Sequence, residues 1–116
     1  KIPFVNENEK MERALKIIND KRLGFLVIIN QQGITKGIFT DGDLKRLMQK
    51  KRGINNFKIK RFMTKKPFIV EKNMLITDIL SLMNKRKITN VCVYSKENNK
   101  KTIGVIHIHD LLKNLN

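Results

Sequence analysis

The chain has 116 residues, a hydrophobic content of 41% and a formal net charge of +15 at pH 7. This length allows one small domain, or two interlocked half-size units, with a mostly aliphatic core because Trp is absent. The basic residues are mostly scattered lysines without interleaved aromatic side chains, which favours a solvated surface and disfavours a nucleic-acid interface. The absence of a long apolar run or secretory signal disfavours membrane insertion and export.

The first half of the chain predicts a helix, two strands and a second helix. The first helix is indicated by apolar residues at helical spacing, namely Met11, Ala14, Leu15 and Ile18. The β-rich run FLVII (25–29) and the run KGIFT (36–40) flank a turn signal at Gly33, which predicts two strands. A short helix is expected around Asp43.

The second half repeats this order. Its helical stripe consists of Ile76, Ile79, Leu80 and Met83. The predicted strands are VCVY (91–94) and IGVIH (103–107), and a short helix follows around Asp110. Each half also opens with Pro-Phe and an apolar residue, at 3–5 and 67–69. The one cysteine, Cys92, lies in an apolar strand and is expected to be a buried, reduced thiol, which favours a cytoplasmic location.

This duplication predicts a mixed α/β (α+β) fold built from two repeats. We assign residues 1–48 to repeat 1, residues 49–62 to a basic linker and residues 63–116 to repeat 2. Each repeat alone is too small to cover its own sheet, so we expect the two sheets to pack together with pseudo-two-fold symmetry and flanking helices. The linker carries apolar residues such as Ile54 and Ile59, so we expect it to be ordered.

Two phrases connect this organisation to a known family. Met63-Thr64-Lys65-Lys66-Pro67 has the form Met-Thr-x-x-Pro, and GIFTDGD (37–43) has the form Gly, two apolar residues, Thr, two variable residues and Asp. The second half has GVIHIHD (104–110), with His107 in the place of Thr. Over essentially its whole length the chain resembles the CBS domain pair, also called a Bateman module. The resemblance implies a regulatory, ligand-sensing pair that forms a homodimer and has no catalytic residues.

A narrower resemblance concerns the strings GIFTDGDLKRLM and GVIHIHDLLKNL. They are similar to the C-terminal CBS pair of bacterial D-arabinose 5-phosphate isomerases, which feed Kdo synthesis for lipopolysaccharide. That resemblance implies an upstream sugar-isomerase (SIS) domain in the same parent chain, outside this sequence. It also implies an adenine nucleotide, or the downstream nucleotide-sugar CMP-Kdo, as an anionic effector. Val27 and Cys92 stand where many CBS domains have Pro, a departure that bears on adenine preference.

The first candidate site lies where a strand gives way to a helix. Thr40 can donate its hydroxyl to a phosphate oxygen, and Asp43 can accept hydrogen bonds from sugar hydroxyls, close to the helix start that favours anions. Both residues also suit a purely structural role, Thr40 as an N-cap and Asp43 as an acidic residue in the first turn. Gly37 is expected where packing leaves no room for a side chain.

The matching place in the second half carries His107 and Asp110. We expect His107 to replace the threonine hydroxyl and to contact an anionic ligand in a pH-sensitive way. His107 and His109 would share one face of a strand, a geometry that could begin a metal site. No further Cys or His completes a tetrahedral set, so no metal or other cofactor is assigned.

Other candidate ligand-binding residues precede the first strand of each pair. Thr89 and Asn90 match Gly24 and Phe25 of the first half, and in CBS domains these places often line the ligand cleft. Phe25 suits either stacking on a base or burial in the core. Basic residues near the helix ends, Arg22 and Arg86, suit a phosphate or the helix dipole.

Two alternatives to ligand sensing remain at this point. The histidine at position 107 and the missing prolines would also suit a ligand-free structural or oligomerising module. A nucleic-acid-binding basic surface is the third possibility, and it predicts an affinity that falls steeply with salt.

Overall fold

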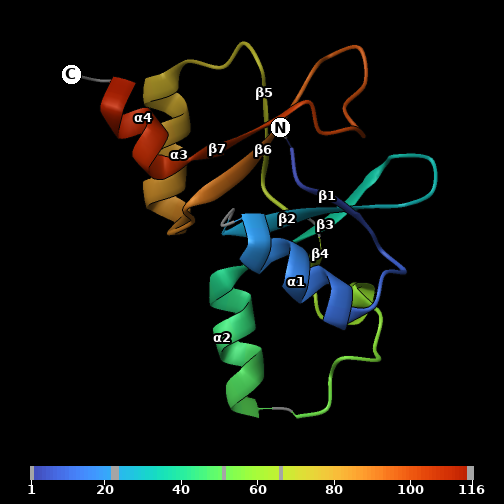
Figure 1. The fold of residues 1–116 in the computed structure, drawn as a ribbon. Helices are drawn as coiled ribbons and strands as arrows, with labels where there is room; N and C mark the ends of the chain where they lie inside the picture. The colour runs from blue at the N-terminus through green and yellow to red at the C-terminus, as the bar shows by residue number, and fades with distance from the viewer. Residues whose placement is uncertain (1, 22–23, 51, 66, 115–116) are drawn as a thin grey trace. The chain divides into compact units, whose positions relative to one another are not determined.

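Each half of the chain folds around its own β-sheet (Figure 1). The computed structural model describes residues 2–21, 24–50, 52–65 and 67–114, and the chain divides into two units, 1–67 and 68–116. The mixed α and β class predicted from the sequence is confirmed. Within the described ranges, no helix has both the length and the apolar character needed to cross a membrane.

The first unit contains a four-stranded sheet in the order β1-β2-β3-β4. β1 pairs with β2 in parallel, whereas β2–β3 and β3–β4 are antiparallel. The elements in chain order are β1 (Phe4–Asn6), α1 (Met11–Lys21), β2 (Phe25–Ile29), β3 (Thr35–Thr40), α2 (Asp41–Lys50), the 3₁₀ helix η1 (Ile59–Arg61) and β4 (Thr64–Lys65). β4 therefore places Thr64 in the sheet of the first unit.

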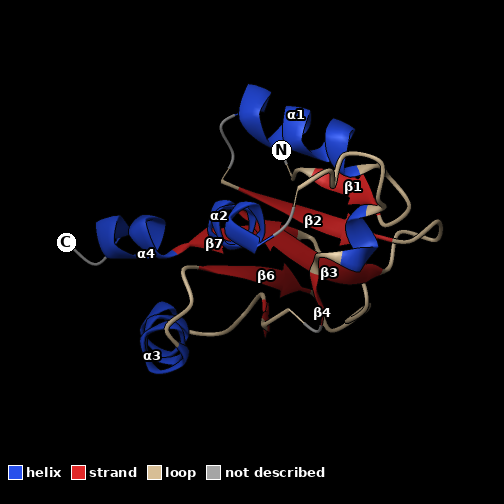
Figure 2. Ribbon diagram, turned by 90° about the horizontal axis from the view of Figure 1, so that it is seen from below, coloured by secondary structure: helices blue, strands red, loops and turns tan. Residues whose placement is uncertain are grey.

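The core of this unit forms between α1 and the sheet, and Figure 2 shows α1 lying along β2. Met11, Ala14 and Ile18 are buried, as the helical stripe predicts. They pack with strand residues and with two residues of the connecting segment, so the set is completed by Val5, Leu26, Ile28, Phe39, Ile54 and Ile59. Through Ile54 and Ile59 the connecting segment packs onto the core of the first unit.

The second unit has a three-stranded sheet in the order β5-β6-β7. Its elements are β5 (Ile69–Glu71), α3 (Ile76–Arg86), β6 (Asn90–Tyr94), β7 (Gly104–His107) and α4 (Ile108–Asn114). The buried core is smaller and wholly aliphatic apart from one thioether, and consists of Val70, Ile79, Met83, Val91 and Leu111. Ile76, which the stripe also included, is 40% exposed at the first position of α3.

The strand registers show the internal repeat directly. Phe4 pairs with Val27 in the first unit, and Ile69 pairs with Cys92 at the equivalent place in the second. The backbone agrees, since the Val27 N–H donates to the Pro3 oxygen and the Cys92 N–H donates to the Phe68 oxygen. Aligning the two Pro-Phe phrases is therefore wrong by one residue, because Pro3 corresponds to Phe68 and not to Pro67.

The predicted order of helix, strand, strand and helix is also incomplete. Each unit begins with a further strand, β1 or β5, that pairs in parallel with the next strand along the chain. β1 and β5 are three residues long and β4 is two, so none shows enough alternation to reveal a strand.

Cys92 is buried in β6, as expected, and its location leads to a first testable prediction. Burial raises the pKa of the Cys92 thiol, and a hydrogen bond with Thr102 opposes this only in part. The folded state therefore holds the proton more tightly, so its contribution to stability is present below the unfolded pKa and is lost as pH rises through the folded value. At pH 8 we expect DTNB to react on the order of a hundredfold more slowly with the native chain than in 8 M urea. Equal rates in the two conditions would contradict a buried thiol.

Candidate functional site

The end of β3 and the start of α2 form a reciprocal hydrogen-bonded cap. The Thr40 N–H donates to Asp43 Oδ2 at 2.9 Å, and the Asp43 N–H donates to Thr40 Oγ1 at 3.1 Å. This is the arrangement of a capping box, with the acidic residue three positions after the N-cap. The helix consequently begins at Asp41, two residues before the predicted start. Thr40 therefore acts as the N-cap of α2 and Asp43 as an acidic residue in its first turn, which are the structural roles considered for them.

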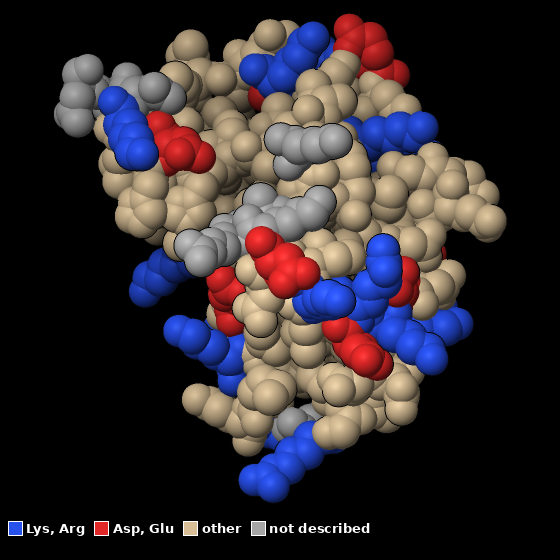
Figure 3. All heavy atoms as spheres, viewed as in Figure 1, with Lys and Arg blue, Asp and Glu red and all other residues tan. Residues whose placement is uncertain are grey.

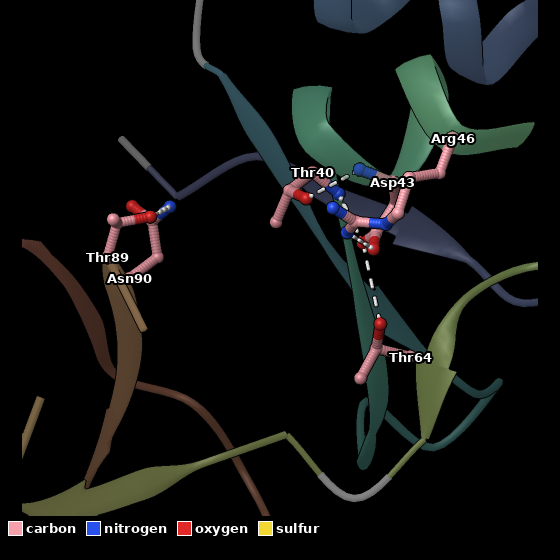
Figure 4. A network of polar contacts seen from close by, with 6 residues as sticks. All are labelled: Thr40, Asp43, Arg46, Thr64, Thr89 and Asn90. Atoms are coloured by element: carbon pink, nitrogen blue, oxygen red, sulfur yellow. Dashed lines mark hydrogen bonds and ion pairs between the residues drawn. The ribbon is translucent and has the colours of Figure 1, made fainter. Parts of the chain in front are cut away.

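Asp43 also has two partners outside the cap, and Figure 4 shows the whole network. Arg46 Nη2 donates to Asp43 Oδ1 at 2.7 Å, and the Thr64 hydroxyl lies 3.4 Å from Asp43 Oδ2. The Asp43 side chain is only 17% exposed, whereas that of Arg46 is 67% exposed. Both carboxylate oxygens thus have donors before any ligand arrives, and Arg46 leaves a partly free guanidinium at the surface.

In the second unit, a different residue caps the helix that follows the last strand. His107 is the last residue of β7, and its Nδ1 accepts a hydrogen bond from the His109 N–H at 3.1 Å. His107 is thus the N-cap acceptor of α4, and in this arrangement Nδ1 carries no proton while Nε2 carries one. The expectation that His107 and His109 share a strand face is wrong, because His109 lies in α4. The two rings stack instead, with centroids 4.8 Å apart.

Thr89 and Asn90 lie beside this helix start. The Ile108 N–H donates to the Thr89 backbone oxygen at 2.8 Å, and Asn90 pairs with His107 across the sheet. Asn90 Nδ2 donates to Thr89 Oγ1 at 3.3 Å, whereas Asn90 Oδ1 is buried and has no hydrogen-bond partner. A buried amide oxygen without a donor is costly, so it is a position where a ligand donor would be favourable.

The first unit repeats this layout. The Asp41 N–H donates to the Gly24 backbone oxygen at 2.9 Å, and Phe25 pairs with Thr40 across the sheet. The start of β2 therefore meets the start of α2 in the first unit, and the start of β6 meets the start of α4 in the second. This brings Thr40 and Asp43 together in one unit, and Thr89, Asn90, His107 and the nearby Asp110 in the other. Phe25 is 8% exposed, so of its two proposed roles the core role is the one observed.

The same duplicated unit is found by comparison with known proteins. The CBS domain family profile matches residues 1–50 and 59–116. The chain belongs to the CBS domain family. CBS pairs are regulatory modules, which agrees with the function class predicted from the repeated closing phrases.

Individual relatives support this assignment of the CBS pair. The arabinose 5-phosphate isomerase KdsD of Yersinia pestis is 39% identical over 112 residues, which is 97% of this chain and 33% of that protein. A signal-transduction protein with CBS domains from Burkholderia ambifaria superimposes with a TM-score of 0.86 and 26% identity, covering 99% of this chain and 82% of the other. CBSX2 in complex with AMP gives a TM-score of 0.81 at 20% identity, covering 98% of this chain and 87% of the other. The chain thus spans a third of the length of the curated relatives it matches.

The basic residues assigned to phosphate contacts have different outcomes in the CBS pair. Arg22 lies outside the described residues. Arg86 ends α3, where its charge complements the helix dipole, and its guanidinium lies 5.4 Å from the centroid of the Phe68 ring. The structure thus gives Arg86 two local roles that need no phosphate.

Asp110 is exposed in the first turn of α4. No hydrogen bond or ion pair engages its carboxylate within the described part of the chain. Asp110 is therefore a free acceptor, in contrast to Asp43. Three or more His, Cys, Asp or Glu side chains arranged to hold a metal ion do not occur among the described residues.

Sequence reasoning missed Arg46 and Thr64. Arg46 follows Asp43 by three positions within a helix, a spacing that places the two side chains on one face and could have indicated the ion pair. Thr64 belongs to the Met-Thr-x-x-Pro phrase, but its contact with Asp43 depends on the β3–β4 pairing, and no local pattern predicts that pairing.

Proposed function

We propose that this chain is the regulatory CBS pair of an arabinose 5-phosphate isomerase and that it binds an adenine nucleotide. The first part is supported by the 39% identity with KdsD of Yersinia pestis, of which this chain corresponds to one third. The remaining two thirds of that relative would include the upstream SIS domain predicted from the sequence. The second part is supported by the AMP complex of CBSX2, which shares the fold.

The observation that carries the ligand proposal is the donor and acceptor pattern of the second unit. Asn90 Oδ1 is buried without a donor, and the Asp110 carboxylate is exposed without a partner. An exocyclic amino group of a base would satisfy the amide oxygen, and sugar hydroxyls would satisfy the carboxylate. His107 Nε2–H and Thr89 Oγ1 would complete the contacts near a phosphate or sugar oxygen.

Regulation follows if the ligand binds one arrangement of the pair more tightly than another. The equilibrium between arrangements then shifts by the difference in binding free energy, and the effect is transmitted to an attached domain. CMP-Kdo, like an adenine nucleotide, has sugar hydroxyls for the Asp110 carboxylate and an exocyclic amino group, on cytosine, for Asn90 Oδ1. What favours CMP-Kdo over an adenine nucleotide is its position downstream of the isomerase reaction.

The proposal predicts that Asp110→Asn weakens AMP binding on the order of tenfold to a hundredfold, because a charged acceptor of sugar hydroxyls is lost. Asp110 has no intramolecular hydrogen bond among the described residues, so the substitution leaves the fold unchanged. The measurement is isothermal titration of this chain with AMP, ATP and CMP-Kdo at physiological salt.

The matched control is Asp78→Asn, which removes the same charge from the first turn of α3. Equal weakening by Asp110→Asn and Asp78→Asn would mean that only net charge matters. Tighter binding of CMP-Kdo than of AMP would reassign the effector while keeping the site.

A second function is favoured by contacts that both units already make at their strand ends. Both oxygens of Asp43 already have donors and His107 already caps a helix, as expected if the sites hold no ligand. The chain would then act as a homodimerising element. Absence of heat with all three nucleotides, together with a dimer in analytical ultracentrifugation, would establish this alternative.

A further inference from the structure

A cavity lies within residues 1–67, away from the strand end that carries Thr40. Its volume is about 560 Å³, and it is lined by Glu7, Lys36, Lys60, Arg61, Met63 and Lys65. This size falls within the usual range for small-molecule sites. Lys36 and Thr40 lie near opposite ends of β3, roughly 13 Å apart at about 3.3 Å per residue.

The backbone that carries these cations is fixed by the fold. Lys65 lies in β4, where it pairs with Gly37 beside Lys36. The 3₁₀ helix η1 is held to the start of the chain, because the Lys60 N–H donates to the Glu7 oxygen at 3.0 Å. Ile59, the first residue of η1, is completely buried. Three separate segments thus bring four positive charges to one concave surface.

Arg61 is positioned more closely than an ordinary surface arginine. Its guanidinium lies 4.3 Å from the centroid of the Phe57 ring and 5.9 Å from that of Phe62. The two rings contact edge to face, with centroids 5.9 Å apart. A guanidinium that stacks on a ring keeps its in-plane N–H groups available for an oxyanion.

The four basic side chains are not neutralised by neighbours. Neither of the two ion pairs in the described ranges involves Lys36, Lys60, Arg61 or Lys65. Glu7 is the single carboxylate in the lining, so the cavity carries three positive charges in excess. Figure 3 shows Lys and Arg side chains spread over the face in view, some of them beside acidic side chains.

We propose that this cavity binds a small oxyanion with at least two negative charges, such as a pyrophosphate or a phosphorylated metabolite. Arg61 offers a planar pair of donors, and the three lysines offer mobile donors around it. An extended nucleic acid fits less well, since the four cations gather on one concave surface and Arg61 already stacks on Phe57, which would otherwise stack on a base. The proposal does not depend on the nucleotide site of the second unit.

The test is isothermal titration of the purified chain with inorganic pyrophosphate at 0.15 M NaCl. The double variant Lys36→Glu/Lys60→Glu is expected to weaken binding at least about tenfold, because two attractive contacts become repulsive. The matched control Lys85→Glu/Lys100→Glu makes the same change of net charge on exposed lysines of the second unit and is expected to stay within about twofold. Glu7→Gln is expected to strengthen binding about threefold, which a misfolded protein would not do.

Two further arms identify the ligand chemistry. Citrate binding as tight as pyrophosphate would assign the cavity to oxyanions in general, whereas pyrophosphate alone would assign it to phosphates. Equal weakening by the two double variants, or no binding of either anion, would overturn the proposal.

Binding of a short DNA duplex that is lost with Lys36→Glu/Lys60→Glu, without any binding of pyrophosphate, would overturn it in favour of a nucleic-acid surface. Retention of AMP binding by Lys36→Glu/Lys60→Glu would show that this cavity and the nucleotide site are separate.

Discussion

Replacing Phe39 with alanine is expected to lower the free energy of unfolding of the first unit by about 3–5 kcal/mol. Phe39 lies in β3 with no exposed surface and heads the fully buried side chains by volume. It pairs with Leu26 across the sheet and packs in the same core as Met11. Removal of the ring would leave a cavity between α1 and the sheet, because the surrounding β-sheet backbone relaxes only in part.

The free energy of unfolding is measured by urea denaturation, and hydrogen exchange at single amides then shows which unit has lost protection. The control is Phe4→Ala, since Phe4 is 43% exposed on β1 and its loss is expected to cost less than about 1 kcal/mol. The second unit has its own core without an aromatic residue, so its β6 amides should keep most of their protection. Similar losses from Phe39→Ala and Phe4→Ala would contradict the assigned core.

The sequence allowed the larger elements of both units to be predicted, because each has a regular apolar pattern. β2 and β6 were visible as β-rich apolar runs, and the stripe around Met11 predicted α1. The short strands were not visible, because β1, β5 and β4 owe their conformation to pairing with β2, β6 and β3. A tertiary contact, rather than a local preference, decides such segments.

The candidate site shows the same division between local and long-range information. Thr40 and Asp43 lie three residues apart, so their cap follows from a local phrase. In the second unit the predicted strand end, His107, is the observed end of β7, but the expected strand face shared by His107 and His109 is wrong, because His109 already lies in α4. The helix begins at Ile108, before the predicted start around Asp110, because His107 caps it, and histidine is not among the usual capping residues.

Gly37→Ala is expected to destabilise the first unit by about 1–3 kcal/mol through overpacking. A Cβ at Gly37 would lie 2.6 Å from the Thr64 backbone oxygen and 2.8 Å from Met63 Sδ. Both distances are shorter than van der Waals contact, and the oxygen belongs to the backbone of β4, so β4 must move away from β3. The prediction that Gly37 stands where no side chain fits is thereby confirmed.

The control is Gly104→Ala, at the matching glycine of the second unit. A Cβ there would meet the nearest atom, Val93 Cβ, at 3.7 Å, which is an ordinary contact. This change is expected to be neutral or to stabilise by about 0.5–1 kcal/mol, because alanine loses less backbone entropy than glycine on folding. Thermal unfolding of the two variants side by side would decide, and equal shifts would contradict a special role for Gly37.

Gly37→Ala is also expected to change the hydrogen bonds of Asp43 in the candidate site. Displacement of β4 separates Thr64 from Asp43, whose Oδ2 then loses one of its two donors, while the cap from Thr40 persists. The freed lone pair of Asp43 would become available to a ligand hydroxyl. Gly37 therefore allows β4 to pair closely with β3, and this pairing brings the Thr64 hydroxyl to Asp43 Oδ2. The close packing that Gly37 permits therefore also determines which hydrogen bonds the Asp43 carboxylate of the first CBS repeat makes.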